Sequence, residues 1–138
     1  MSTRARPDLS WILNKLLAES AHGRHAVLAA ADGLPIVASQ DVDRALADSV
    51  AALASGLLSL SRSGARFVSG NVSPWQLTMS TYADGYLFIM AAAEGTFLVT
   101  SAGPDVDISA FSHAMRTTID RLGHEMGVAP RLPTADSA

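Results

Sequence analysis

The chain has no cysteine among its 138 residues and a single lysine, Lys15. The missing cysteine excludes disulfide bonds, thiolate nucleophiles, and zinc or iron–sulfur sites built on cysteine. Charged residues make up only 17% of the chain, and the net charge is −3. Nucleic-acid-binding domains normally carry a clustered basic face, whereas the ten basic residues here are scattered along the sequence. The composition therefore predicts no nucleic-acid partner.

Long hydrophobic runs are missing as well. The longest, Leu87 to Ala93, is far shorter than the roughly 20 residues that span a bilayer. The polar and basic start, Met1 to Pro7, does not resemble a signal peptide. With 49% hydrophobic residues the chain can still build a sizeable core. We therefore expect a cytoplasmic protein without membrane insertion, consisting of one domain over residues 8–127, a flexible stretch at 1–7 and a disordered tail at 128–138.

Three segments have the spacing of amphipathic helices. The first begins at Asp8, an expected N-cap, and Gly23 stops its pattern; the second runs from about Asp43 to Ser61; the third begins at Asp107. In each, apolar residues recur every three or four positions. In the third helix these residues are Ile108, Phe111, Met115, Ile119, Leu122 and Met126.

Five further segments have the character of β-strands. Asp32-Gly33 joins the first two, which predicts a hairpin with a type I′ turn. Pro35 cannot donate to a neighbouring strand, so it predicts a sheet edge. Two tight links, Asp84-Gly85 and Glu94-Gly95, join the last three strands into a meander. The predicted strands are Ala26–Ala31, Leu34–Ser39, Trp75–Tyr82, Tyr86–Ala92 and Thr96–Ser101, which makes the element order α-β-β-α-β-β-β-α.

The second helix has two apolar faces. We define the leucine stripe as one side of about 100°, which is expected to cover the sheet, formed by Leu46, Val50, Leu53, Leu57 and Leu60. Beside it lies a flank of mostly small residues, expected to lack a partner within the subunit, formed by Ala47, Ala51, Ala54, Ser55 and Leu58. Small side chains let two helices approach closely, although alanine is also simply the best helix former.

The strand Trp75–Tyr82 contains no charged residue. Monomeric proteins usually protect an open sheet edge with lysine, proline or a bulge, so a neutral edge favours pairing with a second chain. Together with the small-residue flank this predicts a homodimer. The residues predicted to form its interface are Ala47, Ala51, Ala54, Ser55, Leu58, Trp75, Leu77 and Met79.

Recognisable catalytic and ligand motifs are missing. The phosphate-binding pattern GxxxxGK[ST] fails at Lys15, and GxGxxG and GxSxG do not occur. His22 and His25 in a turn have no third ligand at metal-site spacing. His113 and His124 lie about 16 Å apart along their helix. Asp105 and Asp107 are expected to cap the third helix and complement its dipole. The sequence therefore predicts no enzyme, no metal and no cofactor.

Several local motifs resemble the roadblock (dynein light-chain) family, particularly bacterial members encoded beside a small Ras-like GTPase and a sensor-kinase-like protein. The resembling stretches cover about Leu9 to Gly127 and are Arg24-His25-Ala26-Val27-Leu28, Ala31-Asp32-Gly33-Leu34, Ala52-Leu53-Ala54-Ser55-Gly56-Leu57, Gly85-Tyr86-Leu87-Phe88-Ile89 and Ala91-Ala92-Ala93-Glu94-Gly95. The chain departs from the pattern at His113-Ala114-Met115, where relatives often have Tyr-Glu-Met, and at Ser73-Pro74-Trp75-Gln76.

The resemblance implies an α+β fold with a five-stranded antiparallel sheet in the order 2-1-5-4-3. The second helix would lie on one face, and the first and third on the other. It also implies homodimers that pair the third strands and the second helices, and a non-catalytic regulator or scaffold of a small Ras-like GTPase in a bacterial signalling complex. A purely structural dimerisation module and a PAS-like small-ligand sensor are the alternatives. The predicted core has no buried polar candidate, which argues against the sensor.

Overall fold

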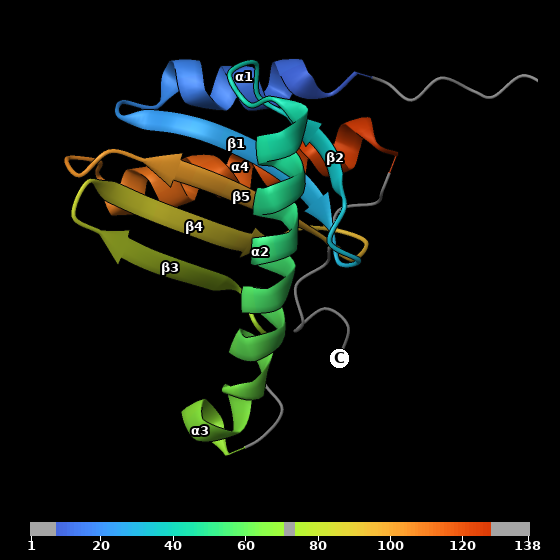
Figure 1. The fold of residues 1–138 in the computed structure, drawn as a ribbon, viewed down its shortest axis with the longest axis vertical. Coiled ribbons are helices and arrows are strands. Elements are labelled where there is room, and N and C mark those ends of the chain that lie inside the picture. The colour runs from blue at the N-terminus through green and yellow to red at the C-terminus, as the bar shows by residue number, and fades with distance from the viewer. Residues whose placement is uncertain (1–7, 71–73, 128–138) are drawn as a thin grey trace, which may run out of the picture.

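The computed structural model describes residues 8–70 and 74–127, and Figure 1 shows their arrangement. The predicted tails at 1–7 and 128–138 lie outside these residues. The short helix α3 is the one element that the sequence did not predict. In chain order the elements are α1 (Ser10–Glu19), β1 (Gly23–Ala30), β2 (Pro35–Ala38), α2 (Arg44–Ser63), α3 (Ala65–Ser69), β3 (Leu77–Tyr82), β4 (Gly85–Ala91), β5 (Thr96–Ala102) and α4 (Ile108–Glu125).

The five strands form one antiparallel sheet in the order β2-β1-β5-β4-β3, which confirms the predicted fold. Helices α1 and α4 pack on one face, while α2 crosses the strands on the other (Figure 1). Strand β2, which begins at Pro35, forms one edge of the sheet, and β3 forms the other. The short strand β2 and the longer strand β3 are therefore the two edges of the sheet.

The turns follow from a few backbone positions. Between β1 and β2 only Gly33 has a positive φ, 88°, so the expected type I′ turn at Asp32-Gly33 is wrong. The amide of Ala30 donates to Leu34 O at 2.9 Å instead, which closes a three-residue loop with glycine in the left-handed region. Between β4 and β5, Glu94 and Gly95 have φ values of 57° and 71°, the pair of positive angles that a type I′ turn requires.

Helix starts are fixed by aspartates. Asp107 accepts a hydrogen bond from the Ala110 amide at 3.0 Å, which confirms the predicted cap of α4. Helix α1 begins differently, because Leu9 and not Asp8 is its N-cap residue. The Asp8 carboxylate accepts hydrogen bonds from the backbone and side chain of Ser10, and these bonds lower its pKa. Asp8 therefore supports the entry to α1 from one position earlier in the chain.

Candidate functional site

Helix α2 meets the sheet with a different side from the one predicted. Ala47, Ala51, Ala54 and Leu58 are buried, and Ala51 and Ala54 have no exposed surface at all. Ala51, Ala54 and Leu58 pack against the sheet within the subunit, so the expectation that they lack an intramolecular partner is wrong. The leucine stripe lies on the adjacent side and is only partly covered. Leu53 and Leu60 are 49% and 71% exposed, whereas Val50 and Leu57 are half-buried against the core under α2.

The physical reason is complementary volume. The sheet beneath α2 presents bulky side chains, among them Phe97, Ile89 and Val99, all of them buried. Alanines at three of the four contact positions let the helix axis approach those side chains closely and fill the space without voids. A leucine stripe on top of the same bulky sheet residues would hold the helix further away. Apolar spacing alone cannot reveal this, because both sides of α2 have helical period.

A hydrogen bond shows which way the leucine stripe points. Ser55, on the flank of α2 opposite the stripe, donates its hydroxyl to Ala31 O at 3.0 Å, next to the β1–β2 hairpin. At about 100° per residue, the stripe lies roughly 110° from the centre of the buried side and about 180° from Ser55. Because Ser55 faces the hairpin end of the strands, the stripe faces the other end. Ser55 itself is thus turned away from the stripe.

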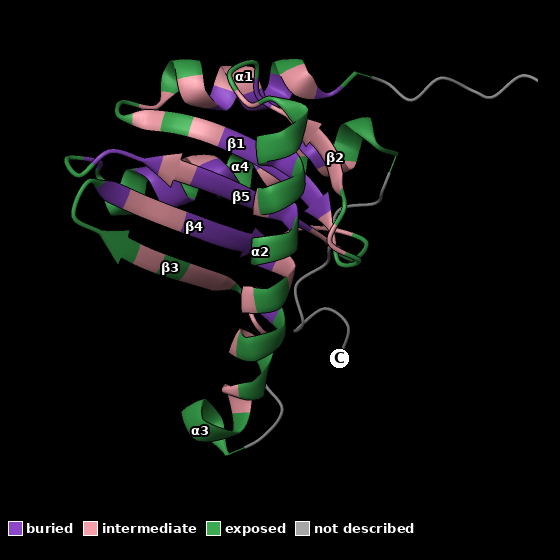
Figure 2. Ribbon diagram, viewed as in Figure 1, coloured by how far each residue is buried: buried purple, intermediate pink, exposed green. Residues whose placement is uncertain are grey.

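That other end of the sheet is only partly covered. Beneath α2, paired residues of four strands form a row in which Val27, Val99 and Ile89 are buried. Two positions along each strand lies a second row on the same face, and every member of it is half-buried (Figure 2). We call it the open row; it consists of His25, Ser101, Leu87 and Ser80, each paired with its neighbour across the strands.

Strand β3 ends the sheet beside this surface. It is uncharged over its six residues, and its outer side pairs with no other described strand. Met79 is exposed, whereas Leu77 packs against the core under α1 and α4. Trp75 is half-buried and donates from Nε1 to Thr78 Oγ1 at 2.7 Å, and the Ser61 hydroxyl of α2 lies 2.8 Å from the same oxygen. These bonds fix β3 relative to α2.

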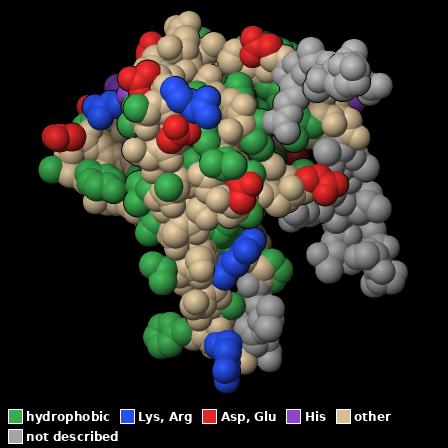
Figure 3. All heavy atoms as spheres, turned by 45° about the vertical axis from the view of Figure 1, so that its right-hand side comes forward, with side chains coloured by type: hydrophobic (Ala, Val, Ile, Leu, Met, Phe, Trp, Pro, Cys, Tyr) green, Lys and Arg blue, Asp and Glu red, His purple; other side chains and the backbone are tan. Residues whose placement is uncertain are grey.

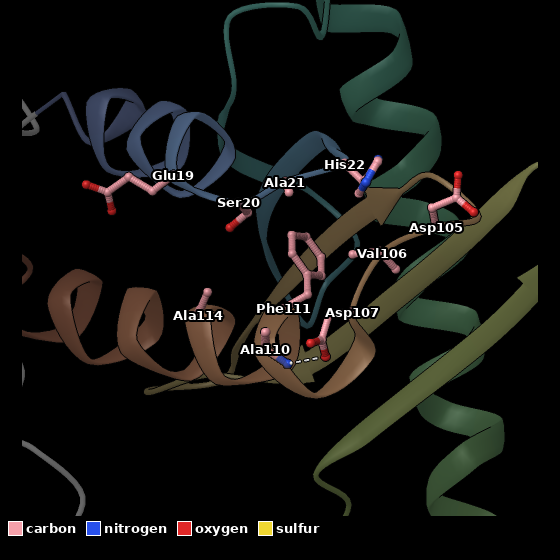
Figure 4. Close-up of a pocket in the computed structure, with 10 residues that line it drawn as sticks. All are labelled: Glu19, Ser20, Ala21, His22, Asp105, Val106, Asp107, Ala110, Phe111 and Ala114. Atoms are coloured by element: carbon pink, nitrogen blue, oxygen red, sulfur yellow. Dashed lines mark hydrogen bonds between the residues drawn. The ribbon is translucent and has the colours of Figure 1, made fainter.

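A hollow of about 370 Å³ lies between the end of α1 and the start of α4 (Figure 4). In this hollow the Asp107 carboxylate accepts the hydrogen bond that caps α4. The pKa of Glu19 is lowered, chiefly by a hydrogen bond from Lys15. His22 lines the same hollow, with a positive φ of 71°. Within the described part of the chain, no three histidine or acidic side chains are grouped so that they could hold a metal ion. The hollow thus offers no recognisable catalytic arrangement.

Buried polar side chains occur, contrary to the prediction of an entirely apolar core. Their hydrogen bonds serve the fold. Ser39 Oγ accepts from the Ala26 amide, Thr118 donates to its own helix, and Thr100 donates to Met115 Sδ at 3.3 Å. They lie on different elements and satisfy local groups, so they do not form the convergent polar set of a ligand cavity.

His113 and His124 are exposed on α4, and the unusual entry to β3 begins at Ser73, which lies outside the described residues. No helix of residues 8–70 and 74–127 combines the length and apolar character needed to cross a bilayer. What these residues bring together is therefore one surface formed by the leucine stripe, the open row and the β3 edge.

The same fold is found in proteins of known class. The sequence model described as Roadblock/LC7 domain matches residues 9–102, which run from α1 through β5. A Roadblock/LC7 domain from Streptomyces avermitilis is 30% identical with a TM-score of 0.80, over 88% of this chain and 99% of that chain. The chain belongs to the Roadblock/LC7 family.

More distant structures share the architecture. Myxococcus xanthus MglB is 15% identical with a TM-score of 0.73, over 96% of this chain and 98% of that chain. An MglB structure described as having a tetrameric arrangement is also 15% identical, with a TM-score of 0.75, over 92% and 93% of the two chains. At this identity the likeness shows the fold alone. No curated protein matches the chain.

Proposed function

We propose that the protein is a homodimeric, non-catalytic regulator or scaffold of a small Ras-like GTPase in a bacterial signalling complex. The observation that carries the proposal is the partly exposed leucine stripe of α2 beside a half-covered sheet and an uncharged edge strand. All three features lie on one side of the subunit. Each is an unfavourable surface for a monomer in water.

The leucine stripe has the spacing of a helix that pairs with another helix. Leu46, Val50, Leu53, Leu57 and Leu60 follow one another at intervals of four, three, four and three residues. This is the heptad pattern of a seam between two packed helices. A two-fold dimer brings the same surface of each copy together, so a self-complementary stripe suits a second copy of this chain.

The proposed interface differs from the predicted one. The β3 edge still contributes Met79, Trp75 and Leu77 to the interface. The contact between the two helices is formed by the leucine stripe instead of the buried alanines. Two β3 strands paired antiparallel would extend the sheet through both subunits. The two α2 helices would then lie side by side on the same face.

The GTPase part of the proposal rests on family membership. The roadblock resemblance implies proteins that bind Ras-like GTPases or assemble complexes around them, in some cases with a sensor-kinase-like protein nearby. The MglB structure with a tetrameric arrangement supports carrying self-association over to this chain.

The first experiment measures mass. Native mass spectrometry or light scattering at micromolar concentration should give twice the subunit mass of 14.4 kDa. A single-subunit mass under these conditions would overturn the dimer.

The second experiment tests the GTPase. Each small Ras-like GTPase encoded beside this gene or elsewhere in the same genome is loaded with GDP or a non-hydrolysable GTP analogue and passed over the immobilised protein. We expect one of them to bind with a preference for one nucleotide state. The Leu53→Glu variant, designed to separate the subunits, should bind less. If none of the GTPases binds in either state while the protein is dimeric, it is a purely structural dimerisation module.

A further inference from the structure

The end of α2 and all of α3 project beyond the sheet. In Figure 1 the lower turns of α2 pass the β3 edge and lead to α3, clear of every strand. This projection carries large apolar side chains that are mostly exposed to solvent in the subunit. Phe67 and Val68 on α3 are 97% and 78% exposed.

The projection also has a distinct charge. Residues 49–83 contain two arginines, Arg62 and Arg66, and no acidic residue. Figure 3 shows this end of the molecule with hydrophobic and basic side chains and no acidic ones on the visible face. The side of α3 is thus an apolar surface flanked by guanidinium groups.

The open row also contains two buried polar atoms that lack a hydrogen-bond partner. His25 Nδ1 and Ser101 Oγ are buried atoms, and neither has a hydrogen-bond partner among the described residues. They are paired across β1 and β5, so the two atoms belong to the same corner of the sheet. Buried polar atoms are rarely left without a partner, because each loses its bonds to water. Because both atoms are covered by this chain's own atoms, the two side chains must turn outward before a second chain can supply the missing bonds.

We infer that the occupant of this corner is α3 of the second copy, an inference that rests on the proposed homodimer. A two-fold axis at the β3 edge turns the projecting end of each α2 back over the sheet of its partner. Neighbouring helices pack about 8–10 Å apart, and positions two residues apart on a strand are separated by about 7 Å. The partner's α2 beside this α2, together with the α3 that directly continues it, therefore falls over the row next to the one that α2 covers, which is the open row.

The chemistry of the two surfaces matches. Phe67 and Val68 supply apolar cover for Leu87 and for the methylene groups around it. Arg66, adjacent in sequence, carries N–H groups that can donate to the imidazole nitrogen and the hydroxyl oxygen once those side chains turn outward. Each dimer thus contains two copies of a composite site, in which the sheet of one subunit is completed by the helix end of the other.

The inference can be tested with a spin label, because the chain has no native cysteine. Val68→Cys is labelled with a nitroxide and mixed with unlabelled, ¹⁵N-enriched wild-type chain, so that only contacts between subunits are seen. The label should broaden the amide signals of His25, Leu87 and Ser101 in the mixed dimer. The control is a label at Asp120→Cys, an exposed position on α4 across the sheet, which should leave these signals sharp.

Two results would overturn the inference, and they can be told apart. If the mixed sample has the mass of a dimer but the Val68 label leaves the three signals sharp, α3 docks elsewhere and the homodimer still stands. If the sample is monomeric, the composite site and the proposed homodimer fall together.

A second measurement uses Phe67→Ala. Since Phe67 is almost wholly exposed in the subunit, its removal should leave the folding of the subunit unchanged and raise the dimer Kd roughly tenfold or more. Leu34→Ala is the matched control, because Leu34 is an equally apolar, 61% exposed residue at the β1–β2 hairpin, away from the β3 edge. Equal Kd values for both variants and the wild type would contradict the role of Phe67.

Discussion

The two faces of the sheet are covered to different extents. On the face toward α1 and α4, the paired residues Phe88 and Thr100 are buried, as is Ala102 further along β5. On the face toward α2, burial stops after one row, and the open row is only half-covered (Figure 2). The same strands therefore present a core buried across β4 and β5 on one side, with only Met79 of the edge strand exposed in the row of Phe88, and a less complete core on the other.

The width of a helix explains the difference. A helix with its side chains is about 10–12 Å across, and two of them cover a sheet of this size. The α1 and α4 face has two helices, whereas the α2 face has one. A domain that leaves room for one more helix on one face is suited to receive it from another chain. This asymmetry leads to the following predictions.

The largest expected effect is that of Ala51→Glu. Ala51 is fully buried against the sheet, so the variant places an unpaired carboxylate in an apolar contact and should lower the free energy of unfolding by about 4 kcal/mol. Chemical denaturation measures this. The control Ala52→Glu changes the exposed neighbour on the same helix and should have little effect. Retained stability in Ala51→Glu together with a lost dimer would restore the originally predicted interface.

Phe88→Ala tests the complete face. Phe88 has no exposed surface and packs 5.2 Å from Phe111 between ring centres, so its truncation should cost about 3 kcal/mol of unfolding free energy. The dimer Kd, measured by sedimentation under conditions where the variant is folded, should remain that of the wild type. A large rise in Kd would show that this face also takes part in association.

Leu53→Glu tests the incomplete face. Leu53 is in the middle of the leucine stripe and 49% exposed. A glutamate there should leave the folding of the subunit unchanged and weaken the packing of a second copy against the stripe. We expect a rise of about 100-fold in the dimer Kd, or about 2.7 kcal/mol. Ser59→Glu, on the far flank of α2, is the control and should associate normally. The proposal fails if both variants remain equally dimeric.

The smallest expected effect is that of Ser61→Ala. It removes the 2.8 Å hydrogen bond between α2 and Thr78 of the edge strand, and it should cost about 1 kcal/mol of unfolding free energy. Ser63→Ala, whose exposed hydroxyl makes a 3.4 Å bond within the helix, should cost less. If the two variants are equally stable, the link between α2 and β3 contributes nothing measurable.

Much of the fold could be predicted from local patterns. Helical spacing located α1, α2 and α4, and Asp107 was correctly identified as a cap. Pro35 correctly predicted a sheet edge. These features depend on neighbours within a few residues, which a sequence displays directly. The short helix α3 was missed, because five residues are too few for a periodic signal and its two large apolar residues, Phe67 and Val68, pack against no described part of the sheet.

The orientation of α2 could not be predicted in the same way. Its two apolar sides, centred on Ala51 and Leu53, both fit a helix that packs on a sheet. By residue size alone, the leucine side is expected to form the core. Phe97 and Val99 of β5 are bulky and face α2, but their position is known only once β5 is placed in the sheet. Their volume favours the alanine side of α2 as the core side. The half-exposed state of His25 and Ser101 likewise depends on how far along the strands the helix crosses.

The amino-acid sequence by itself determined the element order, the neutral edge strand and the existence of two apolar sides on α2, because each arises from residues close together in the chain. Only the tertiary structure decided which side of α2 became core and which row of the sheet was left open. Both outcomes depend on the fit of volumes between segments far apart in sequence, and no local pattern encodes that fit.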